Sequence, residues 1–173
     1  SHVDRSISGP KPFLDTNVMG LQILLESIRK FDKKLIQIST DEVFGSLKKG
    51  SAKEEDSFNP ASPYAASKAA SYVLANAFAL ENKLELCYLR IFSAFGEGQF
   101  KDNFWPALRE AALHGKDFSM SPGEQVRDYI PVEDVVEDIL FACEREDITR
   151  EQPSLSNVGS GNPVTMRKFE IGR

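Results

Sequence analysis

The fold follows from the stretch KLIQISTDEVFG, residues 34–45, in which a short apolar run leads into two adjacent carboxylates. The apolar part, Lys34 to Ser39, predicts a buried β-strand because it is short and is followed by polar residues. A second run, LELCYLRIF at residues 84–92, is continuous enough to be a strand buried on both faces. Strands that alternate with long helical patterns predict an α/β chain whose parallel sheet is covered on both faces.

Six further segments are expected from apolar spacing, proline positions and polarity. They are a helix over 13–31 opened by Pro10 and Pro12, a long polar loop over 45–63, a helix from Pro63 to Phe78, helices over 103–114 and 132–144, and a short strand and turn over 154–161.

Composition excludes several classes of protein. The 173 residues carry a net charge of −5 and are 41% hydrophobic, which suits one globular domain without a basic nucleic-acid-binding surface. The two cysteines, Cys87 and Cys143, form no CxxC motif, so we expect neither a disulfide framework nor a metal site. No apolar run approaches the roughly 18 residues of a membrane span. We expect a cytoplasmic protein without nucleic-acid or membrane partners.

Tyr64 and Lys68 lie four residues apart near the start of a predicted helix, so both project from the same face. An ammonium close to a phenol favours the phenolate, and such a tyrosine can act as a general base toward a sugar or alcohol hydroxyl. The alternative is an aromatic packing residue beside a lysine that reaches solvent.

Thr40, Asp41 and Glu42 follow the first strand directly. Open α/β sheets bind ligands at the carboxyl ends of their strands. Of two adjacent carboxyl groups there, one can stay protonated as an acid while the other serves as a base. The alternative is a polar exit from the strand, with solvated acids and Thr40 as a capping hydroxyl.

Four motifs together resemble the extended short-chain dehydrogenase/reductase family. They are SHVDRS at 1–6, TNVMG at 16–20, ISTDEVFG at 38–45 and SPYAASK at 62–68. Within the family they are most similar to the nucleotide-sugar 4,6-dehydratases, in particular those acting on dTDP-glucose. The resemblance implies a partial Rossmann-like doubly wound parallel sheet. Residues 1–95 would be the C-terminal half of the dinucleotide-binding domain, and residues 96–173 part of a smaller substrate-binding region.

The glycine-rich turn of dinucleotide-binding proteins has no counterpart in this sequence, which contains neither GxGxxG nor GxxGxxG. That turn holds the pyrophosphate on backbone N–H groups. The chain also begins without Met. We therefore expect a fragment that lacks the N-terminal cofactor turn and need not be active by itself.

The resemblance implies NAD as cofactor and five catalytic residues. Tyr64, assisted by Lys68, would take the proton of the sugar C4 hydroxyl while C4 is oxidised, and Thr40 would hydrogen-bond that hydroxyl. Glu42 would then remove the C5 proton, and Asp41 would protonate the departing C6 hydroxyl. Hydride return to C6 would complete the conversion of an NDP-glucose, with dTDP-glucose the first choice, to a 4-keto-6-deoxy sugar.

The resemblance also implies that Tyr64, Lys68 and Asn17 bind the cofactor. Asn17 falls where the family has a structural or relay asparagine. The alternative for Asn17 is a polar residue that satisfies nearby backbone.

Arg127 would contact a phosphate or ribose of the substrate, for which a guanidinium has a suitable fork of donors. Its alternative partners are the nearby carboxylates Asp128, Glu133 and Asp134. Ser93 stands where the dehydratase pattern has an asparagine, in a position implied to contact substrate.

Two other functions stay open. Arg90-Ile91-Phe92 and Phe104-Trp105-Pro106 resemble the 4-epimerase and 4-ketoreductase branches, which do not need the carboxylate pair. A non-catalytic binding remnant is the third possibility. Family members pair through helices, and a small apolar face around Ala69, Ala70, Val73 and Ala77 would permit a homodimer.

Overall fold

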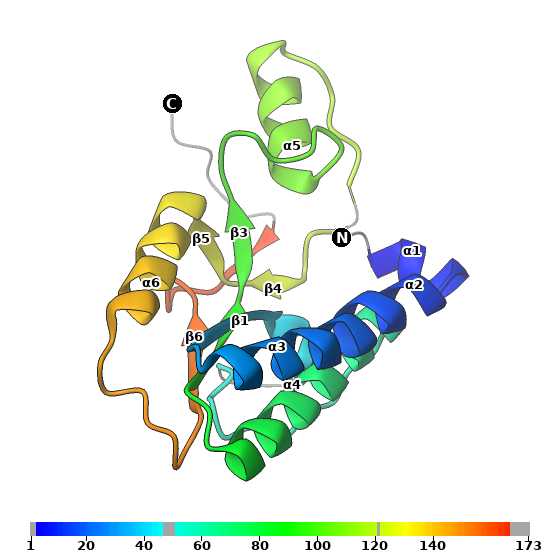
Figure 1. Ribbon diagram of the computed structural model, residues 1–173. Helices are drawn as coiled ribbons and strands as arrows, with labels where there is room; N and C mark the ends of the chain where they lie inside the picture. Colours follow the sequence, from blue (N-terminus) through cyan, green and yellow to red (C-terminus); the bar gives the residue numbers. More distant parts are fainter. Residues whose placement is uncertain (1–2, 47–50, 121, 167–173) are drawn as a thin grey trace.

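A three-stranded parallel sheet forms the centre of the computed structural model, which describes residues 3–46, 51–120 and 122–166 (Figure 1). The strands are β1 (Leu35–Thr40), β2 (Leu86–Ile91) and β6 (Ser154–Val158), in the order β1-β2-β6. Their register pairs Leu35 with Leu86 at one end and Thr40 with Ile91 at the other. The expected α/β class with a parallel sheet is confirmed.

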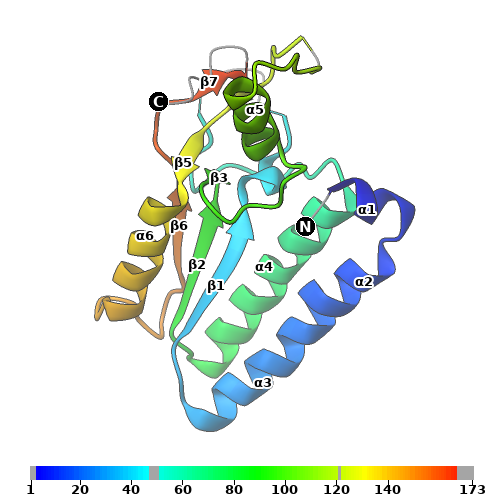
Figure 2. The same cartoon turned by 90° about the horizontal axis from the view of Figure 1, so that it is seen from above.

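Helices cover both faces of this sheet, as Figure 2 shows. The long helices α3 (Leu21–Phe31) and α4 (Pro63–Asn82) lie side by side on one face, and α6 (Val132–Glu144) lies on the other. Parallel strands need a crossover connection such as α4, because the chain must return to the same end of the sheet before the next strand begins.

Two small strand pairs and α5 (Phe104–Leu113) gather beyond the carboxyl ends of the central strands (Figure 2). Strand β3 (Ser93–Phe95) pairs in parallel with β5 (Tyr129–Pro131), and β4 (Val126–Arg127) pairs antiparallel with β7 (Val164–Thr165). These elements are thus folded over the end of the sheet where α/β proteins bind ligands, whereas α6 and β6, from the same half of the chain, belong to the central layers.

The N-terminal helical segment is more complex than its periodicity suggests. It comprises α1 (Val3–Ser8), α2 (Lys11–Leu14), a π-helical stretch η1 (Asp15–Gly20) and then α3, with Pro12 in the first turn of α2. The helix predicted over 13–31 is therefore present, but residues 15–20, close to its start, are wound wider than an α-helix. Such π-helical turns are frequent at functional sites.

The other predicted boundaries hold to within a few residues. Helix α6 matches its prediction residue for residue, while α4 continues four residues past Phe78 to Asn82. It ends where Lys83 takes the left-handed conformation. The predicted loop over 45–63 contains no helix or strand before Pro63, where α4 begins, in its described part. Residues 47–50 of it lie outside the described residues.

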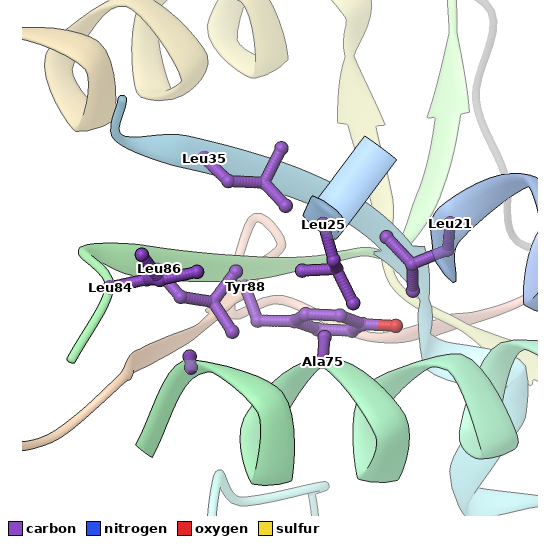
Figure 3. Close-up of a cluster of buried hydrophobic side chains, with 8 residues drawn as sticks. Leu21, Leu25, Leu35, Ala75, Leu84, Leu86 and Tyr88 are labelled. Atoms are coloured by element: carbon purple, nitrogen blue, oxygen red, sulfur yellow. The ribbon is translucent and has the colours of Figure 1, made fainter. Parts of the chain in front are cut away.

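The core on the α3/α4 side consists of buried leucines around one tyrosine (Figure 3). Its members are Leu21, Leu25, Leu35, Ala75, Ala79, Leu84, Leu86 and Tyr88. A second core on the α6 side includes Cys87 and Leu89. Because Leu86 and Tyr88 point to one core and Cys87 and Leu89 to the other, β2 is buried on both faces, as its unbroken apolar run predicts.

The described residues bear on three expectations, which concern membrane-spanning helices, metal-binding groups and disulfides. None of their helices is long and apolar enough to span a membrane. They contain no group of three or more His, Cys, Asp or Glu side chains arranged to hold a metal ion. Both cysteines are free, Cys87 buried and Cys143 exposed.

Candidate functional site

Thr40 closes strand β1 and starts the short 3₁₀ turn η2 (Asp41–Phe44) that carries the two carboxylates. Its hydroxyl accepts a hydrogen bond from the Glu42 backbone N–H at 3.3 Å and donates one to Asp41 Oδ1 at 3.2 Å. Thr40 therefore caps the turn and, at the same time, contacts one of the acids.

The opposite side of this turn is anchored in the core. Val43 and Phe44 are buried, and the Asn59 backbone N–H donates to the Val43 carbonyl at 2.9 Å. Gly45 has a φ of +66°, and a Cβ atom there would lie 2.1 Å from the Asn59 carbonyl oxygen. Only glycine fits that position. The inward residues thus fix the turn that presents Asp41 and Glu42.

Both carboxyl groups have a pKa above the ordinary value. Burial raises the pKa of Asp41, against the hydrogen bond from Thr40 and the positive charge of Arg127. Burial also raises the pKa of Glu42, and the negative charge of Asp41 adds to the effect, while Arg127 opposes it. A pair of acids held closer to neutrality is suited to proton transfer.

Lys68 joins helix α4 to strand β1. Its ammonium donates to the Ile38 carbonyl at 3.1 Å, two residues before Thr40. Burial lowers the pKa of Lys68. Tyr64, one turn earlier on the same face of α4, is partly exposed and packs edge-on against Phe13 with 6.0 Å between ring centroids. Both therefore lie at the start of α4, close to the carboxyl end of β1.

Ser6 fixes the backbone of Tyr64, a contact that sequence reasoning missed. The side chain is fully buried; it accepts from the Tyr64 N–H at 3.1 Å and donates to the Val3 carbonyl at 2.6 Å. The first N–H groups of a helix have no partner within the helix, and here a distant serine supplies one. SHVDRS was recognised as a motif without a role for this serine; its Ser1 and His2 lie outside the described residues.

Asn17 approaches the same helix from η1. Its amide Nδ2 donates to Ser67 Oγ at 2.8 Å, and Ser67 Oγ donates in turn to the Tyr64 carbonyl at 2.7 Å. The contact is to a side chain fifty residues further along the chain, so the interpretation that Asn17 satisfies nearby backbone is wrong. The backbone N–H of Tyr64 is therefore bonded by Ser6, and its carbonyl by Ser67, which in turn accepts from Asn17.

Arg127 lies on β4, where its charge lowers the pKa of Asp41 and Glu42 against the effect of burial. It forms no ion pair with Asp128, Glu133 or Asp134 among the residues that the structure describes. The carboxylate of Asp128 instead accepts from the backbone N–H groups of Ser160 and Gly161. The ion-pair alternative for Arg127 is therefore wrong.

Ser93 lies beside Asp128 and Tyr129, which follow Arg127 in the chain. It begins β3, is half-buried, and its backbone N–H donates to the Asp128 carbonyl at 3.0 Å.

An open hollow of about 810 Å³ lies between the 96–102 loop, α5 and residues 116–118. Its lining includes two aromatic residues, Trp105 and Phe118, and charged side chains of both signs. The charged residues are Lys101, Arg109, Lys116, Glu97, Asp102, Glu110 and Asp117. Trp105 also packs against Phe95 at 5.8 Å between ring centroids, in agreement with a packing role for the aromatic residues.

Comparison with known proteins identifies relatives over nearly the whole chain. Residues 1–159 match the model of the NAD dependent epimerase/dehydratase family. A dTDP-glucose 4,6-dehydratase of Streptomyces antibioticus is 34% identical over 172 residues, which are 96% of this chain and 49% of that protein. The chain spans about half the length of the curated relatives that it matches.

Solved structures share the fold in both branches of that family. A double mutant of DesIV, the dTDP-glucose 4,6-dehydratase of Streptomyces venezuelae with NAD and DAU bound, matches with a TM-score of 0.85 and 31% identity, covering 97% of this chain and 52% of that one. A UDP-N-acetylglucosamine 4-epimerase of Methanobrevibacter ruminantium, in complex with UDP-N-acetylmuramic acid, matches with a TM-score of 0.87 and 26% identity, covering 97% and 55%. The fold alone therefore does not separate the two reactions.

Replacement of Ser6 by alanine should lower the free energy of unfolding by about 1–3 kcal/mol, because the Tyr64 N–H would be left buried without an acceptor. Urea unfolding followed by circular dichroism measures the change. Ser8→Ala is the matched control, since Ser8 is exposed and its hydroxyl bonds only the Arg5 carbonyl. It should change stability by less than about 0.5 kcal/mol. Equal effects of the two substitutions would contradict the role of Ser6.

The raised pKa of Asp41 predicts a pH dependence of stability. The folded protein holds this proton more tightly than the unfolded chain, so this group contributes a loss of stability as pH rises through that pKa. Asp41→Asn removes the loss. The variant should gain stability over the wild type as pH rises from about 3 to about 7, measured by urea unfolding at each pH.

Asp147→Asn is the control of opposite sign, because the hydrogen bond from Arg145 lowers the pKa of the exposed Asp147. The Asp147→Asn variant should therefore not gain stability relative to the wild type as pH rises. A gain by both variants, or by neither, would show that burial of Asp41 is not the cause.

Proposed function

The chain belongs to the NAD-dependent epimerase/dehydratase family, and from this premise we propose that the natural protein is a nucleotide-sugar 4,6-dehydratase, a lyase acting on an NDP-glucose such as dTDP-glucose. The observation that carries the proposal is the acid pair. Asp41 and Glu42, each with a raised pKa, follow β1 directly at the end of the sheet that also holds Tyr64 and Lys68. Elimination of water needs both a base and an acid beyond the group that acts at C4.

The residues present fit the nicotinamide ribose of NAD. The Lys68 ammonium has three donors and uses one on the Ile38 carbonyl, which leaves donors for ribose hydroxyls. Tyr64 and Lys68 would hold this part of the cofactor, and Asn17 would steady them through Ser67. When bound, NAD supplies the oxidant for the sugar's C4 and later the reductant for its C6.

The first proton transfer would take place at the C4 hydroxyl. Tyr64 would accept the hydroxyl proton, and Lys68 lies one turn away on the same face of α4. Thr40 contributes a hydrogen bond from its hydroxyl, which in the structure donates to Asp41. The product of this stage is a ketone at C4, which makes the neighbouring C5 proton acidic.

Elimination would then divide the work between the two carboxyl groups. Glu42 takes the C5 proton; the electrons of that C–H bond form the C5–C6 double bond as the C6–O bond breaks. Asp41 gives its proton to the departing oxygen, which leaves as water. Burial favours the protonated form of Asp41, which agrees with its role as the acid. Burial and the negative charge of Asp41 also raise the pKa of Glu42, against the charge of Arg127, so the role of Glu42 as the base rests on the family resemblance and not on its pKa.

Residues 96–173, of which 167–173 lie outside the described part, would hold the nucleotide, and residues 1–95 the catalytic groups. Arg127 would bind a phosphate or ribose, because no carboxylate of the described residues occupies its guanidinium in an ion pair. Ser93 would line the sugar side of the same region.

A 4-epimerase or 4-ketoreductase is the second candidate, favoured by the match to an epimerase structure with a TM-score of 0.87. Such an enzyme would use Thr40, Tyr64 and Lys68 and leave the acid pair without a chemical task. The two candidates therefore differ in their dependence on Glu42.

We also propose that the protein is a homodimer that pairs through α3 and α4. Small and apolar residues form an exposed stripe at helical spacing along α4: Ala66, Ala70, Val73, Ala77 and Leu80. Ile23 and Leu24 extend it on the adjacent α3. Ala69, assigned to this face from the sequence, is instead buried against Val43 and Phe44. An exposed apolar face of this kind suits a second copy of the chain.

The intact natural protein, incubated with NAD and either dTDP-glucose or UDP-glucose, should produce a sugar nucleotide that has lost one water, measured by mass spectrometry. Glu42→Gln should lower the rate of water loss about 10²–10⁴-fold, because the C5 base is removed. The matched control is Glu81→Gln on the exposed side of α4, which should leave the rate unchanged. A product of unchanged mass with C4 inverted would establish the epimerase, and no product from either sugar would contradict both enzymes.

The dimer proposal predicts that Val73→Asp, which places a carboxylate in the α4 stripe, yields monomers at concentrations where the wild type sediments as a dimer. Val73 is 60% exposed in the single chain. Val136→Asp is the matched control, since Val136 is 48% exposed on α6 at the other face of the sheet. Analytical ultracentrifugation decides the matter: an unaltered Val73→Asp dimer, or loss of the dimer in both variants, would rule out this interface.

A further inference from the structure

Arg90 lies near the carboxyl end of β2 and is only 1% exposed. None of the ion pairs of the described residues includes it. Its Nη1 donates to the Glu54 carbonyl at 3.0 Å and, at 3.5 Å, to Asn157 Oδ1. Its Nε has no hydrogen-bond partner in the described part of the chain. A buried charge with so few polar partners is costly, so its retention calls for a physical reason.

Three aromatic rings surround the guanidinium. Its central carbon lies 4.7 Å from the ring centroid of Phe44, 5.1 Å from that of Phe58 and 5.5 Å from that of Tyr72. The rings also contact one another, with 5.2 Å between the centroids of Phe58 and Tyr72. A planar, weakly hydrated guanidinium stacks on such faces, and a lysine ammonium of the same charge cannot reproduce that contact.

The three rings belong to the segments that hold the candidate catalytic groups. Phe44 ends the η2 turn, three residues after Asp41. Tyr72 lies on α4 four residues after Lys68 and eight after Tyr64, so the three share one face of the helix. Phe58 belongs to the loop that Arg90 also binds through the Glu54 carbonyl. One side chain therefore connects the acid-bearing turn, the Tyr–Lys helix and the loop between them.

We propose that Arg90 is a positioning residue, which holds the η2 turn in register with helix α4 so that Asp41 and Glu42 meet the substrate that Tyr64 and Lys68 bind. It touches no reacting atom itself. This inference rests on the proposed function for its consequence in catalysis, but its structural part, the fixing of residues 40–45, can be measured without any reaction.

The test compares Arg90→Lys with the wild type by hydrogen exchange and mass spectrometry, on the intact natural protein without substrate. We expect amides of residues 40–45 to exchange at least about ten-fold faster in Arg90→Lys, while peptides from β1 and β2 stay within about two-fold of the wild type. Arg150→Lys is the matched control: Arg150 is exposed and pairs with Asp32 and Glu85, which precede β1 and β2 at the end of the sheet opposite the η2 turn. It should leave residues 40–45 unchanged.

The kinetic arm separates positioning from general stability. Arg90→Lys should lower kcat for water loss by up to about 100-fold, because misplacement of a catalytic group by about 1 Å has such an effect. The KM for the sugar nucleotide should change little, since Arg90 lies outside the proposed substrate region. If Arg90→Lys fails to fold, Tyr72→Leu replaces it, because that variant removes a ring from Arg90 without altering the turn itself and should show the same two effects.

Unchanged exchange at residues 40–45, or an equal increase across β1 and β2, would overturn the proposal, as would an unchanged kcat in a variant whose turn has loosened. An inactive wild type whose turn still loosens in Arg90→Lys would overturn the proposed function instead, and leave the fixing of the turn by Arg90 established.

Discussion

The parallel pairing of β1 with β2 is the constraint on which the rest of the structure depends. Their register places Thr40 opposite Ile91, so β1 and β2 end together at the carboxyl end of the sheet, and the chain turns there. Two parallel neighbours also require a crossover, which α4 provides. The helix therefore begins where β1 ends and returns to where β2 begins. The acid pair and the Tyr–Lys pair come together because one strand pairing fixes both ends of this crossover.

The site is assembled at a cost in stability that the core offsets. Asp41, Glu42 and Lys68 are partly buried, and burial moves the pKa of each toward its neutral form. Groups whose pKa is shifted in this way by burial cluster at functional sites. The surrounding contacts are of the opposite kind: Val43 and Phe44 are buried, and Ser6 and Ser67 satisfy the backbone of Tyr64.

Periodicity was sufficient to predict the sheet, the helices and the position of the acid pair, because those features depend on residues close in the sequence. Helix α6 and the two-sided burial of β2 are examples. The π-helical stretch Asp15–Gly20 has no such signature, since its apolar pattern equals that of an α-helix. The contacts of Ser6 with Tyr64, and of Arg90 with Glu54, span 58 and 36 residues and depend on tertiary packing that no local pattern encodes.

The η2 turn separates anchoring from chemistry within four consecutive residues. Val43 and Phe44, together with Gly45 behind them, carry the packing, whereas Asp41 and Glu42 make little of it. Exchange of the two acids for other side chains would leave the frame of the turn intact. Under the proposed function, a lineage with this architecture can therefore change its chemistry by substituting two adjacent codons, without first having to evolve a new scaffold.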